Sequence, residues 1–176
     1  MTVPTSVAIT SVRRLAVVEA TGTVRPAGGI AGALRGTFDD TSRALALSGG
    51  GYTFAGNVAA DGILIGTYTG PDDARGGFSA LNSTSNPVTV FCGSAAENEI
   101  GREGPIPFTL QVSSNGAVSG MVLGDPACAL TGRANGTSVS VTDCEGRPNT
   151  GTILGGTVSG TTPSGARFSG STSACQ

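Results

Sequence analysis

The stretch Asp61-Gly62-Ile63-Leu64-Ile65-Gly66 joins a turn dipeptide to a short β segment that ends in glycine. The chain repeats this arrangement twice, as Asn115-Gly116-Ala117-Val118-Ser119-Gly120 and Gly155-Gly156-Thr157-Val158-Ser159-Gly160. Asp-Gly, Asn-Gly and Gly-Gly supply the positive φ angles that a two-residue hairpin turn needs. The chain is therefore predicted to repeat a hairpin unit.

The rest of the chain supports an all-β fold. Glycine accounts for 29 of 176 residues, and tryptophan is absent, so the core must be built from small aliphatic residues and six phenylalanines. Glycine weakens a strand, and we expect Gly66, Gly120 and Gly160 to mark bends or places where a neighbour packs closely. Strong curvature favours an antiparallel, barrel-like meander of hairpins, and a two-sheet β-sandwich is the alternative.

The segment 82–87 (Asn-Ser-Thr-Ser-Asn-Pro) is the best candidate junction between two halves. We expect an N-terminal β half at 1–81 and a C-terminal β half at 88–176, within one continuous β architecture. The first strand, residues 6–12, precedes the repeated hairpins. We expect it to find its partner far along the chain or on another molecule.

Composition excludes several classes of function. Charged residues make up 12% and the net charge is −2, which disfavours binding to nucleic acid. The chain has no histidine and no lysine, so it can form neither a Ser-His-Asp triad nor a Ser-Lys dyad. No cysteine or carboxylate spacing matches a metal site, and we expect no metal and no cofactor. The protein is predicted not to be an enzyme.

The four cysteines favour two disulfides and an oxidising compartment. Cys128 and Cys144 lie nearly symmetrically about Asn135-Gly136, so a hairpin folded there brings them opposite each other. We predict the pairs Cys128–Cys144 and Cys92–Cys175. We also expect Gly62, Gly116 and Gly136 to have positive φ in hairpin turns.

One group of residues could hold a sugar. Tyr52 and Tyr68 flank a loop that contains Asp72, Asp73 and Arg75. An aromatic face beside acidic and basic side chains would suit a pyranose ring. The competing interpretation, favoured by the enrichment of aromatic residues in strands, is that the rings belong to the core.

Four stretches resemble uncharacterised exported, glycine-rich β-repeat proteins of GC-rich bacteria. They are GGGYTFAGNV (49–58), GTYTGPDDARGGFSAL (66–81), VFCGS (90–94) and GTVSGTTPSGARFSGSTSAC (156–175). The resemblance implies an exported, non-catalytic β module and carries no binding residues over. DGILIGTY (61–68) is weakly similar to avidin-type barrels, but the tryptophans of a biotin site are missing, so we expect no biotin.

Together these features predict a non-catalytic structural or adhesive module of a cell surface, virion or filament-like assembly. The alternative is a module that binds a glycan or a small ligand. Its partners would be further copies of itself or a surface glycan, without membrane insertion, because no apolar run approaches the roughly 20 residues of a membrane span. The N-terminus lacks the pattern of a signal peptide. An extracellular location would then require a removed signal or another export route, such as a virion.

Overall fold

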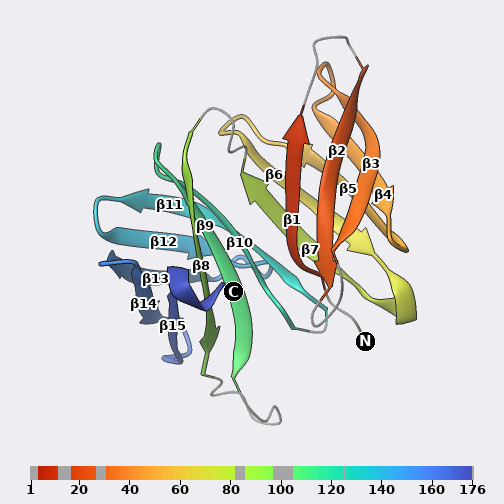
Figure 1. Ribbon diagram of the computed structural model, residues 1–176. Coiled ribbons are helices and arrows are strands. Elements are labelled where there is room, and N and C mark those ends of the chain that lie inside the picture. Colours follow the sequence, from red (N-terminus) through yellow and green to blue (C-terminus); the bar gives the residue numbers. More distant parts are fainter. Residues whose placement is uncertain are drawn as a thin grey trace.

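The computed structural model describes residues 4–11, 17–26, 31–81, 86–96, 105–124 and 126–175, and most of these residues lie in β-strands. The strands form two separate sheets in which neighbouring strands are antiparallel. Figure 1 shows the two units side by side, the first in red to yellow-green and the second in green to blue. The predicted all-β, barrel-like fold class is confirmed.

The first half forms an open seven-stranded sheet in chain order. Its strands are β1 (Pro4–Ser11), β2 (Val17–Pro26), β3 (Gly32–Asp39), β4 (Ala44–Gly49), β5 (Tyr52–Val58), β6 (Ile63–Thr69) and β7 (Arg75–Leu81). A short 3-10 turn, η1 (Pro71–Asp73), lies between β6 and β7. Strands β1 and β7 are the two ends of this sheet.

The expectation for the N-terminal strand is wrong. Strand β1 pairs antiparallel with β2, its neighbour in sequence, and Val7 lies opposite Val24 in the register. The first strand therefore finds its partner in the next strand along the chain. Residues 12–16, which join the two strands, lie outside the described residues.

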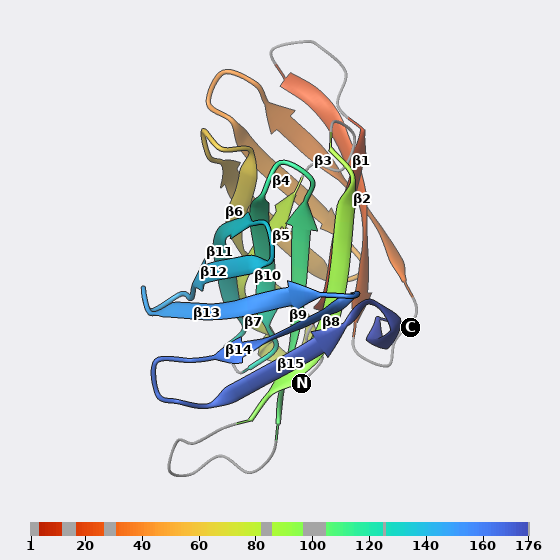
Figure 2. The same cartoon turned by 90° about the vertical axis from the view of Figure 1, so that its left-hand side faces the viewer.

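The second half forms a closed eight-stranded barrel (Figure 2). Its strands are β8 (Val88–Ala95), β9 (Ile106–Ser113), β10 (Ala117–Val122), β11 (Cys128–Asn135), β12 (Ser138–Thr142), β13 (Pro148–Leu154), β14 (Thr157–Thr161) and β15 (Arg167–Ser171), followed by η2 (Thr172–Ala174). Pairing of β15 with β8 closes the barrel. The change from sheet to barrel falls between Leu81 and Val88, so the two halves are separate sheets rather than one continuous one.

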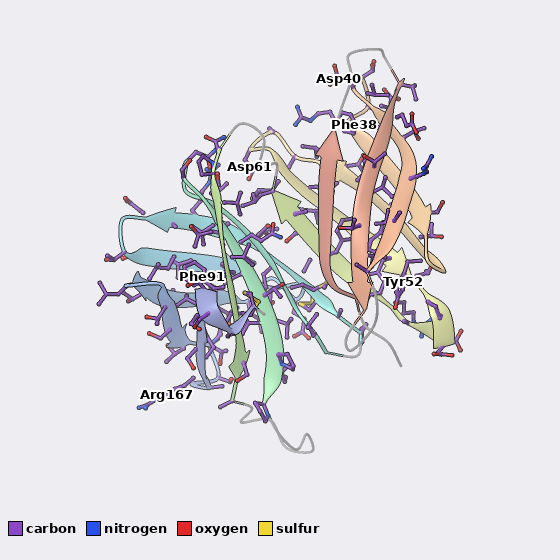
Figure 3. The ribbon with its side chains drawn as sticks, in the orientation of Figure 1. Phe38, Asp40, Tyr52, Asp61, Phe91 and Arg167 are labelled. Carbon is purple, nitrogen blue, oxygen red and sulfur yellow. A yellow bond between two sulfur atoms is a disulfide. The ribbon has the colours of Figure 1, made fainter. Side chains whose placement is uncertain are left out.

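The molecule has two apolar cores, and the one under the open sheet also takes in Met121 and Ala127 from the second half. Alternating side chains of β4 and β5 face inward, including Leu45, Leu47 and Phe54, which are almost fully buried. The barrel encloses a second cluster around Phe91 and Val118. Figure 3 shows Tyr52 in the sheet and Phe91 in the barrel.

Two of the repeated glycines provide close approach for a phenylalanine ring. In the barrel, Gly160 lies opposite Phe168 in the register, and a Cβ at Gly160 would overlap that ring and the Thr150 carbonyl. In the open sheet, Gly66 lies opposite Phe78 in the register, and a Cβ at Gly66 would overlap the Phe78 ring and the Ala55 carbonyl. The expectation that a neighbour packs closely at these glycines is confirmed at both positions.

Strand β7 joins the sheet to the barrel through polar contacts. The Ser79 hydroxyl is buried and lies 2.6 Å from the Leu130 carbonyl, 2.9 Å from the Gly120 carbonyl and 2.8 Å from the Gly120 backbone nitrogen. The Gln111 side-chain oxygen accepts hydrogen bonds from Leu81 N at 3.2 Å and from the Ser119 hydroxyl at 3.1 Å. These contacts fix the sheet against β9, β10 and β11.

Both predicted disulfides are present. Cys128–Cys144 spans 16 positions of the chain, and Cys92–Cys175 spans 83. The predicted turn geometry is also confirmed, because Gly62, Gly116 and Gly136 have φ angles of 85°, 84° and 58°.

Candidate functional site

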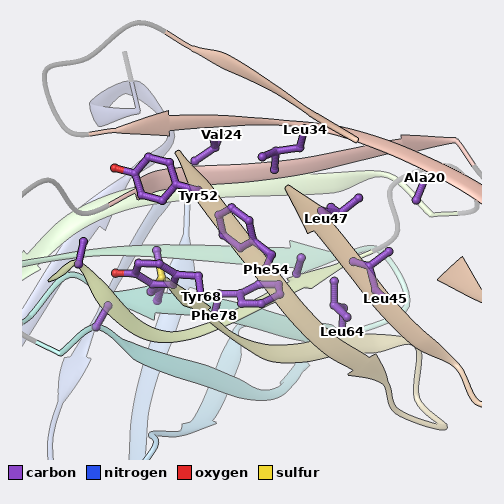
Figure 4. Packing of buried hydrophobic residues seen from close by; sticks show 14 residues of the cluster. Ala20, Val24, Leu34, Leu45, Leu47, Tyr52, Phe54, Leu64, Tyr68 and Phe78 are labelled. Carbon is purple, nitrogen blue, oxygen red and sulfur yellow. The ribbon is translucent and has the colours of Figure 1, made fainter. Parts of the chain in front are cut away.

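The tyrosines proposed for sugar binding belong to the core of the open sheet. Tyr52 and Tyr68 are 3% and 2% exposed, and their ring centroids lie 6.5 Å apart. The Phe54 ring belongs to the same buried cluster, and its centroid lies 5.7 Å from the centroid of the Tyr68 ring (Figure 4). These buried rings offer no open face to a pyranose.

The charged members of that proposed site lie on the surface. Asp72 and Asp73 are exposed in η1, and Arg75 is exposed at the start of β7. The loop does approach the Tyr52 ring, because a Cβ at Gly70 would overlap it. The structure therefore brings loop and ring together but covers the ring with backbone.

A different site lies inside one end of the barrel. A cavity of about 370 Å³ opens where β8, β10, β12 and β14 end and where β9, β11, β13 and β15 begin. Its wall is mainly apolar and includes Phe108, Leu110, Leu130, Val139, Val141 and Phe168. We call it the barrel cavity.

The strand pattern explains which side chains face the interior of the barrel. Side chains of a strand alternate between inside and outside, so the inward positions of β13 are Asn149, Gly151 and Ile153. Gly151 and Gly160, the latter on β14, make room for the Phe168 ring, whose tip lies where a Cβ at either position would be. An eight-stranded barrel has an interior that either is filled by side chains or holds one small ligand.

Charged side chains of the described lining lie in the loop between β12 and β13. The Asp143 carboxylate accepts hydrogen bonds from the backbone nitrogens of Glu145 at 3.0 Å and Arg147 at 2.9 Å. It also accepts one from Arg147 Nε at 2.9 Å, and the Arg147 guanidinium lies 3.2 Å from the Glu145 carboxylate. The three charges at the rim of the barrel cavity are thus engaged with one another.

The hydrogen bonds to Asp143 change its acidity. Burial by itself would raise the pKa of this carboxyl group, which is only 9% exposed. The backbone and guanidinium groups of Arg147, together with the Glu145 backbone, outweigh burial, so the pKa of Asp143 lies below its usual value. The rim carboxylate therefore stays ionised at neutral pH.

One uncharged polar side chain is buried in the wall. Asn149 is 9% exposed and lines the barrel cavity at the start of β13. Its amide nitrogen donates to the Arg147 carbonyl at 3.1 Å. An asparagine amide has two N–H donors and one carbonyl oxygen. Among the described residues no second partner of this side chain occurs, so one N–H and Oδ1 remain for a ligand.

The Cys128–Cys144 disulfide supports the same end of the barrel. Both cysteines line the barrel cavity, and Cys144 N donates to Cys128 Sγ at 3.0 Å. The bond fastens the rim loop after β12 to the first residue of β11. The rim that carries Asp143 and Arg147 is therefore anchored covalently to the barrel wall.

Sequence reasoning did not find the barrel cavity. The alternation of Val139 with Val141 and of Phe108 with Leu110 marked strands, but it could not show which barrel end stays hollow. Asn149, next to Pro148, has the appearance of a turn residue in the sequence. Its inward orientation is decided by the strand register of β13.

Comparison with known proteins found no matching family model, curated protein or solved structure. Within the described ranges, no group of three or more Cys, Asp or Glu side chains is placed to hold a metal ion. The same ranges contain no helix long and apolar enough to cross a membrane. The two disulfides are compatible with an oxidising environment.

Proposed function

We propose that this protein is a non-catalytic module that binds a small apolar molecule in the barrel cavity. The observation that carries the proposal is the cavity of about 370 Å³ with a mainly apolar wall inside a closed barrel. Ligand pockets usually have volumes of about 300–1,000 Å³ and are lined chiefly by apolar side chains. A small apolar ligand gains affinity there by leaving water.

The wall favours an apolar ligand over a glycan. Each sugar hydroxyl taken into the barrel cavity would need a hydrogen-bond partner to offset its lost hydration. Phe108, Leu130 and Val141 provide none, and the remaining N–H and Oδ1 of Asn149 can serve at most two of the several hydroxyls of a sugar. We therefore prefer the small-ligand half of the sequence-based alternative.

A non-catalytic role fits the chemistry of the rim. Asp143 and Arg147 bind each other, and Asp143 is ionised, so neither is poised to give or take a proton at neutral pH. The sequence has no histidine and no lysine, which are the usual general bases that activate a serine nucleophile. We propose an extracellular or cell-surface location, a virion included, on the basis of the two disulfides.

A fluorescent probe tests ligand binding. N-phenyl-1-naphthylamine is neutral and brightens in an apolar site, so it should bind the oxidised protein with saturable fluorescence. Ala95 ends β8 on the same inward side as Phe91 and lines the barrel cavity, so Ala95→Phe should reduce binding at least tenfold.

Val90→Phe is the matched control. Val90 lies on the same strand but is 39% exposed, so its phenylalanine points away from the cavity and should leave binding unchanged. Melting curves of both variants check that each is folded. No saturable binding to the wild type, or equal binding by both variants, would contradict the proposal.

A structural or adhesive role is the second candidate. The observation that favours it is the open edge of the seven-stranded sheet, where β1 pairs only with β2 among the described strands. An unpaired edge can accept a strand from another molecule. Size-exclusion chromatography and negative-stain imaging of the full chain should then show oligomers that grow with concentration. A monomer at every concentration would count against this role.

A further inference from the structure

We propose that Asn149 selects a neutral ligand that carries one uncharged oxygen, such as a ketone or an alcohol, within an apolar body. This inference rests on the proposed binding function of the barrel cavity and names the class of ligand. It combines three observations: the apolar wall, the engaged charges of the rim, and one buried amide with unused hydrogen-bonding capacity.

The ligand should be neutral because the charged side chains in the described lining of the barrel cavity are already paired with one another. Arg147 is the one cationic side chain of the described lining, and it already contacts Asp143 at 2.9 Å and Glu145 at 3.2 Å. Burying a charge without a partner is very costly. Together with Arg147, the two carboxylates give the described rim residues one net negative charge, which opposes an anion further.

The ligand should carry one oxygen because of the position of Asn149. This side chain is nine-tenths buried at the start of β13, and a single hydrogen bond to the Arg147 carbonyl holds its amide in place. The second N–H of the amide can donate to a ketone or alcohol, and Oδ1 can accept from an alcohol. A ligand without an oxygen would shield the amide from water and leave those hydrogen bonds unmade, so a ligand oxygen that satisfies the amide gains affinity.

Two pairs of probes test the two parts of the proposal. N-phenyl-1-naphthylamine should bind at least tenfold more tightly than 1-anilinonaphthalene-8-sulfonate, which is the same framework with an anionic group. 2-Acetylnaphthalene and 2-isopropylnaphthalene have nearly the same shape, but only the first has an oxygen. Their dissociation constants are measured by displacement of N-phenyl-1-naphthylamine from each protein variant.

The decisive quantity is the ratio of the two dissociation constants. Asn149→Leu keeps the approximate shape of the side chain and removes its amide, so the ratio should shift at least fivefold in favour of the isopropyl compound. Thr150→Leu changes the next residue, which is exposed, and should leave the ratio unchanged. Equal ratios in wild type and Asn149→Leu, or equal affinity for the neutral and anionic dyes, would overturn the proposal.

A measurement on the wild type alone covers the case in which Asn149→Leu does not fold. The infrared carbonyl band of bound 2-acetylnaphthalene should lie at lower wavenumber than that of the ketone in hexane. A band at the hexane position would overturn the role of Asn149. The proposed function is judged separately, because it fails only if no neutral probe binds inside the barrel.

Discussion

The Ser79 hydroxyl lies 2.8 Å from the backbone nitrogen of Gly120, so a side chain of the open sheet takes part in the hydrogen bonding of the barrel wall. Gly120 belongs to β10 and faces Leu130 of β11 in the register. The same hydroxyl lies 2.6 Å from the Leu130 carbonyl, and its single proton can be donated to that group. One serine thus connects three strands from two sheets.

Ser79→Ala should lower the free energy of unfolding by about 1–3 kcal/mol, because it leaves a buried N–H and a buried carbonyl without this partner. Urea unfolding of the oxidised protein measures the loss. Ser140 on β12 is exposed, so Ser140→Ala should stay within about 0.5 kcal/mol of the wild type. Equal stability of the two variants would show that the hydroxyl does not hold the sheets together.

Two turn glycines should differ in their tolerance of alanine. Gly116 and Gly136 both have positive φ, so alanine costs about 1–2 kcal/mol at either position. A Cβ at Gly116 would also crowd the Ala134 carbonyl, whereas nothing lies within 4 Å of one at Gly136. Thermal melting should therefore rank Gly116→Ala as the less stable variant, and the reverse order would refute the steric part of the argument.

The two disulfides should contribute unequally to stability. Loop-closure entropy gives about 3 kcal/mol for the 16-residue separation of Cys128–Cys144 and about 4.5 kcal/mol for the 83-residue separation of Cys92–Cys175. Replacing both cysteines of each pair by serine, one pair at a time, and unfolding in urea tests the order. A larger loss from the shorter loop would mean that the rim loop depends on its disulfide for more than chain entropy.

Acid should weaken the rim loop through Asp143. The folded-state pKa of this group is lowered, so its stabilising effect is complete above the unfolded-state pKa, near pH 4, and is lost as the pH falls through the folded-state pKa. At pH 7 Asp143→Asn should lower the free energy of unfolding by about 1.5 kcal/mol. This is the lower end of the usual range for a hydrogen bond to a charged group, because Arg147 is half-exposed and water weakens its attraction to Asp143.

Unfolding curves at several pH values measure this effect. The difference between wild type and Asp143→Asn should be constant from pH 5 to pH 7 and should shrink below about pH 4. Asp40→Asn, at an exposed turn, serves as the control and should be nearly neutral throughout. A difference that grows in acid would have the wrong sign for this account.

Local patterns made much of the fold predictable. The alternation around Tyr52 and Phe54 marks a strand and puts both rings on one face, which is the core face in the structure. The Cys128–Cys144 disulfide followed from the symmetry of a hairpin, because hairpin register is set by its own turn. Such features depend on a few neighbouring residues.

Features that depend on distant residues were harder to predict, and the Cys92–Cys175 pair followed only because Cys128 and Cys144 were already assigned to each other. Among the described strands, the pairing of β15 with β8, which are far apart in sequence, makes the second half a closed barrel, whereas no such pairing closes the first half. The barrel cavity depends on that closure, because its wall combines residues from the end of β8 with residues from β15. Asn149 therefore could not be recognised as a wall residue from its neighbours alone.

The closure of the barrel also sets the order in which the protein can fold. Every strand pairing except that of β15 with β8 joins neighbours in sequence, so the hairpins can form early and independently. Closure must wait for β15, and Cys92 meets Cys175 only then. During synthesis or export β8 emerges long before β15, with one edge able to pair with other chains. The time until the last strand arrives is thus the period of greatest risk of aggregation.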